Sequence, residues 1–209
     1  MKFFNSYIVL EGADGVGKTT LAKELAKALD AVFMYEPCGE TKVTKQLREL
    51  ALQKEYKEEV NAEAREYIML ANRAVSTERV KKILGEGETI VQDRSAISGM
   101  VYANVASEYS FAAWWSIAYK AFKILPDIVV YVKTDKQNIA ITEGDIYDDE
   151  KESFHTCIKN TFPQVVEWFE KNQGIKNYTF TNDFTATPKE NAQRLIVELT
   201  NFQKKFDTK

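Results

Sequence analysis

Residues 7–20 read YIVLEGADGVGKTT, and this stretch decides the fold. It opens with an apolar run that is typical of a buried strand, and leucines then recur at helical spacing from Leu21 to Leu29. Between the two lie Gly12, four further residues and then Gly17-Lys18-Thr19. Because this pattern follows a predicted strand and opens a predicted helix, it predicts a loop that binds the phosphates of a nucleoside triphosphate.

The residue types in this loop suit a triphosphate ligand. Glycines let consecutive backbone N–H groups turn toward phosphate oxygens with no Cβ in the way. Lys18 supplies a cation for the β- and γ-phosphates, Thr19 offers a hydroxyl to Mg²⁺, and the helix N-terminus favours an anion. We therefore expect ATP and Mg²⁺ as cofactors, with ATP held by Gly12, Ala13, Asp14, Gly15, Val16, Gly17, Lys18, Thr19 and Thr20.

Strand and helix patterns alternate along the rest of the chain. Further strands are expected at 31–35, 89–91, 128–132 and 178–181, and helices at 44–56, 62–84, within 98–125, at 154–172 and from Pro188 onward. Such alternation implies right-handed crossovers and a parallel sheet with helices on both faces. The expected fold class is α/β, a three-layer sandwich with about five strands, and functional groups should gather at the carboxyl ends of the strands.

Composition limits the classes of function. The 209 residues suit one domain, and a net charge of −3 argues against a protein that coats nucleic acid or a membrane surface. Cys38 and Cys157 are too few for a disulfide framework and lack metal-site spacing, so a reducing cytoplasm is the expected location. We find no signal-peptide pattern and no apolar run long enough to span a bilayer. The expected partners are small nucleotides, not nucleic acids or membranes.

Several segments, in order along the chain, resemble the thymidylate kinase family, P-loop kinases that phosphorylate dTMP. The segments are IVLEGADGVGKTT at 8–20, EPCGET at 36–41, MLANRAVSTERV at 69–80, IVQDRSAISGMVYA at 90–103 and GDIYDDEKESFH at 144–155. The resemblance implies an ATP-dependent kinase for a pyrimidine deoxynucleoside monophosphate, dTMP or the similar dUMP. It further implies a single P-loop kinase domain over 1–209, a short lid at about 134–152, and a homodimer.

The same resemblance assigns roles to particular residues. Lys18, Arg94 and Asp14 are the expected catalytic group, with Arg94 facing the transferred phosphoryl group at the end of a central strand. Thr19 and Asp93 are the expected Mg²⁺ site, although Asp93 has an alternative role in holding Arg94. The expected substrate-binding residues are Glu36, Pro37, Met69, Arg73, Arg94, Ser98, Tyr102 and Tyr147.

Three of these residues have specific expected contacts. Arg73 would donate to a pyrimidine carbonyl, Tyr102 would pack beneath the deoxyribose, and Met69 would replace aromatic stacking with a thioether contact. Each has a plainer alternative, which is a solvated helix face for Arg73 and a core position for Tyr102 and Met69. We expect His155, the only histidine, on a helix surface, and Trp114 in the core or at a subunit interface.

The chain also departs from the family pattern. Neither the phosphate loop nor the segment 134–152 contains the arginine that the family uses to neutralise charge during transfer, so Lys136 and Lys151 are the candidate substitutes. Tyr35 stands where the family often has an arginine that touches the acceptor phosphate. Two other functions therefore stay open: a deoxynucleoside kinase with Glu36 as general base, and a nucleotide-binding regulatory protein with slow catalysis.

Overall fold

The sheet contains five parallel strands in the order β2-β3-β1-β4-β5. The computed structural model describes residues 3, 5–135, 146–147 and 150–207. The strands are β1 (Tyr7–Glu11), β2 (Val32–Tyr35), β3 (Ile90–Asp93), β4 (Ile128–Lys133) and β5 (Lys176–Thr181). The expected α/β class with a parallel sheet is confirmed.

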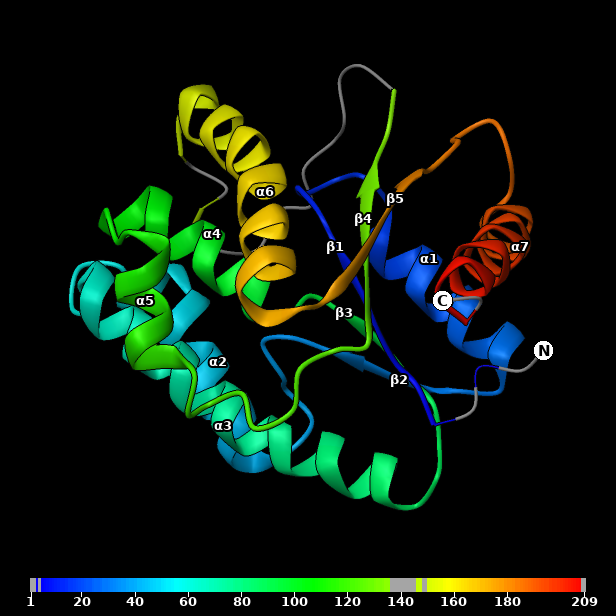
Figure 1. Cartoon of the computed structure of the whole chain (residues 1–209). Coiled ribbons are helices and arrows are strands. Elements are labelled where there is room, and N and C mark those ends of the chain that lie inside the picture. Colours follow the sequence, from blue (N-terminus) through cyan, green and yellow to red (C-terminus); the bar gives the residue numbers. More distant parts are fainter. Residues whose placement is uncertain (1–2, 4, 136–145, 148–149, 208–209) are drawn as a thin grey trace.

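Helices cover both faces of this sheet, so the molecule has three layers (Figure 1). They are α1 (Lys18–Leu29), α2 (Lys42–Leu52), the short 3-10 helix η1 (Lys54–Tyr56), α3 (Ala62–Gly85), α4 (Ala96–Ser107), α5 (Phe111–Ala118), α6 (Glu152–Gln173) and α7 (Pro188–Asp207). Helices α1 and α7 pack on one face, while α3 to α6 lie on the other. No helix in the described part of the chain is long and apolar enough to cross a membrane.

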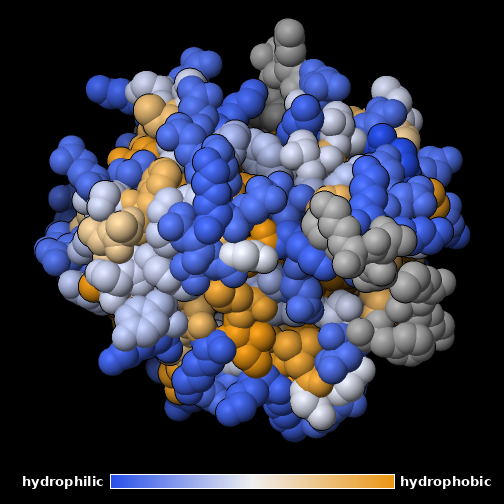
Figure 2. Space-filling model, in the orientation of Figure 1, coloured by the Kyte–Doolittle hydropathy of each residue, from blue (hydrophilic) through white to orange (hydrophobic). Residues whose placement is uncertain are grey.

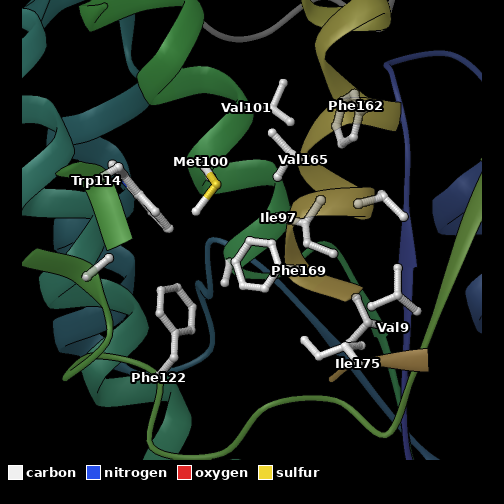
Figure 3. Packing of buried hydrophobic residues seen from close by; sticks show 14 of the residues in the cluster. Val9, Ile97, Met100, Val101, Trp114, Phe122, Phe162, Val165, Phe169 and Ile175 are labelled. Atoms are coloured by element: carbon white, nitrogen blue, oxygen red, sulfur yellow. The ribbon is translucent and has the colours of Figure 1, made fainter. Parts of the chain in front are cut away.

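Alternation along β1 divides the hydrophobic core in two. Ile8 and Leu10 face α1 and α7, whereas Tyr7 and Val9 face the core beneath α4 and α6. In the core beneath α4 and α6, the fully buried Trp114 of α5 packs beside Phe122, with Phe162 and Phe169 of α6 nearer the sheet (Figure 3). Trp114 is thus a core residue, which is one of the two positions expected for it.

Local chemistry explains where the observed helices differ from the expected ones. The helix expected at 44–56 is α2 followed by η1, and α2 starts early because Thr41 forms a capping box with Thr44. The region 98–125 contains two helices. Glu108, with φ of 56°, ends α4 in the left-handed conformation, and the Ser110 hydroxyl then caps α5.

The sheet register brings three strand ends to one place. Asp93 at the end of β3 pairs with Leu10 of β1 on one side and with Tyr35 of β2 on the other. The loops that follow these strands therefore begin side by side at the carboxyl edge of the sheet. This edge holds the candidate site, as expected for a parallel α/β sheet.

Candidate active site

The loop between β1 and α1 has a backbone that only glycine accommodates. Gly12 has φ of +147°, and a Cβ there would collide with the Val132 carbonyl oxygen of β4. Gly17 has φ of +83°, and a Cβ there would lie 2.5 Å from Asn182 Nδ2. That amide group also donates to the Val16 carbonyl oxygen at 2.9 Å, so the segment after β5 supports the loop from outside. Asn182 is a supporting residue that no sequence motif indicated.

Lys18 lies over the inside of this loop. Its side chain is buried, and Nζ donates to the Ala13 carbonyl oxygen at 2.5 Å. Burial, helped by the nearby Arg94 cation, lowers the pKa of Lys18 to about 8. A bound polyphosphate would favour the charged amine, because an anion in a buried site stabilises a cation beside it.

Thr19 and Asp93, the pair predicted to hold Mg²⁺, lie in contact. The Thr19 hydroxyl donates to Asp93 Oδ2, while Asp93 Oδ1 is buried with no hydrogen-bond partner among the described residues. A hydroxyl beside an unpaired carboxylate oxygen suits a Mg²⁺ ion that takes its other ligands from water and phosphate. No cluster of three or more His, Cys, Asp or Glu side chains suited to a metal occurs within the described ranges.

Arg94 follows β3 directly and has an unusual backbone. Its φ is +69°, a conformation that is costly for a residue with a Cβ. The surroundings hold it there, because its N–H donates to the Leu10 carbonyl at 2.9 Å and its own carbonyl accepts from Gln92 Nε2 at 2.8 Å. This backbone directs the guanidinium to Asp14, with which it forms an ion pair, and to Ser98 Oγ at 3.0 Å.

Asp14 connects the phosphate loop to this arginine. One carboxylate oxygen accepts from Arg94 and the other from the Tyr102 hydroxyl at 2.6 Å. Burial acts to raise the pKa of Asp14, but the Arg94 and Lys18 cations outweigh it and lower that pKa. Asp14 is thus an ionised partner that holds Arg94, and the Tyr102 hydroxyl contacts this carboxylate.

Glu11 anchors the start of α4 from beneath. It is fully buried and accepts from the Ser95 hydroxyl at 2.8 Å and the Ser98 hydroxyl at 2.6 Å. Burial raises the pKa of Glu11, and these hydroxyl donors oppose that shift. A hydrogen-bonded chain therefore runs from Glu11 through Ser98 to Arg94 and on to Asp14.

One cavity of about 950 Å³ joins this phosphate end to a second end between α2, α3 and α4. Every predicted substrate residue lines it: Glu36, Pro37, Met69, Arg73, Arg94, Ser98, Tyr102 and Tyr147. Among the predicted ATP residues, Asp14, Gly15, Gly17, Lys18, Thr19 and Thr20 line it, whereas Gly12, Ala13 and Val16 do not.

Arg73 lies at the second end of the cavity, buried between two carboxylates. Its Nε donates to Glu36 Oε2 at 3.1 Å, and its Nη1 lies 3.8 Å from Glu66 Oε1. The alternative expectation of a solvated helix face for Arg73 is wrong, because only 3% of the residue is exposed. Burial raises the pKa of Glu36 to about 7, even though Arg73 opposes the shift.

Basic residues that the sequence analysis did not assign to the site also line the cavity. They are Lys23, Lys45, Arg48 and Arg65. Arg48 of α2 donates to the Pro37 carbonyl at 2.6 Å and lies over the Tyr35 ring at 5.9 Å. The sequence feature that could have indicated Arg48 was its position on the first helix after the EPCGET turn. Helical spacing alone, however, does not tell which side of that helix faces a cavity.

Several expectations concerned the region around the lid. His155 was expected on a helix surface; it lies half-buried on α6, on a side of that helix that lines the cavity. Tyr147 packs against Tyr102, with ring centroids 5.0 Å apart. Lys151 lines a separate hollow with Lys57 instead of the main cavity. Lys136 lies outside the described residues, and so does most of the segment 134–152.

Comparisons with known proteins agree with this geometry. The family model described as thymidylate kinase matches residues 10–194. A thymidylate kinase of Campylobacter jejuni (strain 81-176) is 30% identical over 203 residues, which is 94% of this chain and 98% of that protein. A thymidylate kinase of Helicobacter pylori (strain HPAG1) is 39% identical over 138 residues, which is 64% of this chain and 65% of that protein.

Solved structures share the fold at lower identity. Thymidylate kinase from Candida albicans superposes with a TM-score of 0.72 at 20% identity, covering 95% of this chain and 92% of that one. The enzyme from Ehrlichia chaffeensis gives a TM-score of 0.70 at 18% identity, covering 93% and 98%. With a family match over most of its length, the chain belongs to the thymidylate kinase family, nucleoside monophosphate kinases that phosphorylate dTMP to dTDP with ATP.

Proposed function

We propose that this chain transfers the γ-phosphoryl group of Mg²⁺-bound ATP to the 5′-phosphate of dTMP, with dUMP as the closest competing acceptor. The observation that carries the proposal is the continuous cavity that contains both the triphosphate loop and the buried Arg73. Arg94 also lines this cavity, beside the phosphate loop. Such an arrangement suits two nucleotides bound head to head, with their phosphates meeting near Arg94.

At the donor end, the loop from Gly12 to Thr20 would hold the ATP phosphates through its backbone N–H groups and Lys18. Thr19 and Asp93 would hold Mg²⁺, which neutralises phosphate charge when it is bound. Asp93 Oδ1 is buried and has no partner within the part of the chain that the structure describes, which supports this assignment. Lys18 and Arg94 are the cations proposed to act on the transferred group, with Asp14 positioning Arg94 through their ion pair.

At the acceptor end, Arg48 is proposed to bind the 5′-phosphate of dTMP. Its guanidinium lies beside Pro37 and over Tyr35, the residue that stands in place of the family's phosphate-contacting arginine. Lys45 precedes Arg48 by one helical turn and lines the same cavity, so it adds positive charge there. Arg48 thus supplies from a helix the charge that position 35 lacks.

The acceptor oxygen of a monophosphate is already ionised, so the reaction needs positioning and charge neutralisation and no strong base. Glu36 Oε2 accepts from Arg73 Nε, so this carboxyl group is proposed to hold Arg73 in place. The monophosphate is favoured over the nucleoside as acceptor because the cations Arg48 and Lys45 line the cavity where its phosphate would lie. Met69, Tyr102 and Tyr147 would then pack around the sugar and base, since all line the cavity.

A homodimer is proposed from the outer faces of α2, α3 and α5. These helices carry exposed large apolar side chains: Val43, Leu50, Tyr67, Val75 and Ile117. The face in Figure 2 is mostly hydrophilic, with hydrophobic residues gathered toward the left and lower centre, and the left side is where Figure 1 places α5. Sedimentation velocity of the purified chain tests whether it is a dimer.

A cytoplasmic location is proposed from the ATP requirement and from the free cysteines Cys38 and Cys157.

The acceptor is tested by a coupled assay of ADP release with Mg-ATP and a panel of dTMP, dUMP, dCMP and thymidine. We expect turnover with dTMP, weaker turnover with dUMP, and little with thymidine, which lacks the phosphate for Arg48. Turnover of thymidine alone would overturn the proposal in favour of a nucleoside kinase. ATP binding by calorimetry without turnover of any acceptor would indicate the slow regulatory protein instead.

A further inference from the structure

The second end of the cavity contains a donor and an acceptor that have no partner among the described residues. Arg73 Nη1 is buried without a hydrogen-bond partner among the described residues. Its nearest carboxylate oxygen is Glu66 Oε1, at 3.8 Å, too far for a hydrogen bond. Buried polar groups are nearly always paired, so a group of this kind that lines a cavity points to a ligand.

Glu66 belongs to this end of the cavity and is held firmly. It lies on α3 two turns before Arg73, lines the cavity, and only 8% of the residue is exposed. Its Oε1 accepts from Trp114 Nε1 at 2.6 Å. Its other oxygen, Oε2, has no hydrogen-bond partner in the described part of the chain, so one half of the carboxylate is fixed and the other half is available.

Gly99 of α4 makes room for this arrangement. A Cβ at Gly99 would lie 2.7 Å from Trp114 Cζ2 and 2.9 Å from Arg73 Nη1. Any larger residue would push the indole or the guanidinium away, and with them the partners of Glu66. The missing side chain therefore lets Arg73 and Glu66, which line the cavity, lie together with the buried Trp114 behind them.

We propose that Glu66 determines the base specificity of the acceptor site: its Oε2 accepts the N3–H of the pyrimidine while the Arg73 guanidinium donates to the neighbouring O4. This inference rests on the proposed function, because it concerns the base of the same acceptor nucleotide. Thymine and uracil present a carbonyl oxygen followed by an N–H along one edge, in the order that Arg73 and Glu66 complement. Glu66 is thus a binding residue that supplies the hydrogen-bond acceptor, while Arg73 supplies the donor.

Cytosine presents the reverse order on that edge, an amino donor at position 4 and a bare acceptor nitrogen at position 3. In the same pose its amino group would face the Arg73 cation, and its N3 would face the Glu66 carboxylate. Both contacts are then repulsive and buried, which disfavours cytosine more strongly than a missing hydrogen bond would. Burial also raises the pKa of Glu66, a shift that Arg73 and Trp114 oppose, and an N–H donor from the base would favour the ionised form that accepts it.

The test compares Glu66→Gln with the wild-type chain on dTMP and dCMP. Trp114 donates to the remaining amide oxygen in this variant, so the amide NH₂ faces the base and repels N3–H while matching the N3 of cytosine. We expect kcat/KM for dTMP to fall on the order of 100-fold, with the dTMP-to-dCMP preference falling at least as much. The KM for ATP should stay within twofold.

The matched control is Glu63→Gln, an exposed carboxylate three residues earlier on α3 that does not line the cavity. It should keep both the dTMP rate and the preference over dCMP. A Glu66→Gln variant that folds, binds ATP and keeps the wild-type dTMP-to-dCMP preference would overturn the inference. Wild-type chain without turnover on dTMP or any other acceptor would instead remove the proposed function itself.

A second measurement needs no variant, in case Glu66→Gln does not fold. N3-methyl-dTMP lacks the N–H that Glu66 accepts, so the wild-type chain should use it on the order of 100-fold less well than dTMP. Equal use of the two acceptors would contradict a hydrogen bond at N3. In Glu66→Ala, which removes both the acceptor and its bulk, the difference between the two acceptors should shrink toward a few-fold.

Discussion

The two ends of the active-site cavity are built in different ways. The donor end is made largely by one continuous segment, the loop from Gly12 to Thr20, whose backbone N–H groups suit phosphate of any nucleotide. The acceptor end is made by side chains from α2, α3 and α4 and from the turn after β2. Backbone groups recognise a charge that all substrates share, whereas specificity for one base requires side chains that distant parts of the chain supply.

The two ends also hold their arginines differently. Arg94 at the donor end pairs with Asp14, which remains partly open to the cavity, with 36% of its side chain exposed. Arg73 at the acceptor end lies between Glu36 and Glu66, with 4% of its own side chain exposed. Charge at the donor end can therefore respond to phosphate and Mg²⁺, whereas Arg73, Glu36 and Glu66 form a buried set of donors and acceptors at the acceptor end.

The largest effect is expected from breaking the donor end with Lys18→Ala. This variant removes the cation that contacts the β- and γ-phosphates, and kcat/KM should fall on the order of 1000-fold for every acceptor. The fold should survive, because burial already disfavours the charged amine, as its pKa of about 8 indicates. Steady-state kinetics measure the activity, and a thermal melt measures whether the fold survives. Lys27→Ala, an exposed lysine of the same helix, is the control, and retained activity in Lys18→Ala would refute the loop assignment.

A smaller and more selective effect is expected from Arg48→Ala at the acceptor end. Loss of the proposed phosphate contact should raise the KM for dTMP on the order of 10- to 100-fold while leaving the KM for ATP unchanged. Initial rates at varied dTMP and saturating ATP measure this separation. The control is Arg79→Ala, which removes an arginine that pairs with Glu40 and does not line the cavity. A rise in the ATP KM instead would place Arg48 with the donor.

The last effect concerns stability instead of catalysis, and it is expected in the pH dependence of unfolding, from Glu36. Burial holds its pKa at about 7, above the usual value for a glutamate, so between those two values the folded chain binds a proton that the unfolded chain has lost. Unfolding is therefore increasingly favoured as pH rises through that window, by up to about 3 kcal/mol. Glu36→Gln cannot titrate, so its free energy of unfolding should fall less between pH 5 and 7.5.

Urea denaturation at those two pH values measures this difference, with Glu63→Gln as an exposed control that should follow the wild type. Parallel pH profiles for Glu36→Gln and the wild type would show that Glu36 is ionised in the fold throughout. Arg73 would then lie between Glu36 and Glu66 with Glu36 ionised at neutral pH, and the burial of this group would need another explanation.

Much of the fold was predictable because its signals are local. The run of apolar residues, the glycines and the helical leucines of 7–29 all act within one strand, turn and helix. The division of 98–125 into two helices was missed, because the left-handed Glu108 that separates them carries no glycine signal. Predicted substrate residues all line the cavity, but their sequence motifs did not indicate Glu66, Arg48 or His155.

The sequence by itself determined that this chain has a phosphate loop on a parallel α/β sheet and belongs among the nucleotide kinases, because glycine, lysine and threonine at fixed spacing act through the adjacent backbone. Only the tertiary structure decided how the rest is used. Arg94 reaches Asp14 because β1 holds its backbone in a left-handed conformation. Glu66 meets Arg73 and Trp114 at the cavity because Gly99 of a neighbouring helix leaves the space. Burial and pairing of this kind depend on residues far apart in the chain, so no local pattern records them.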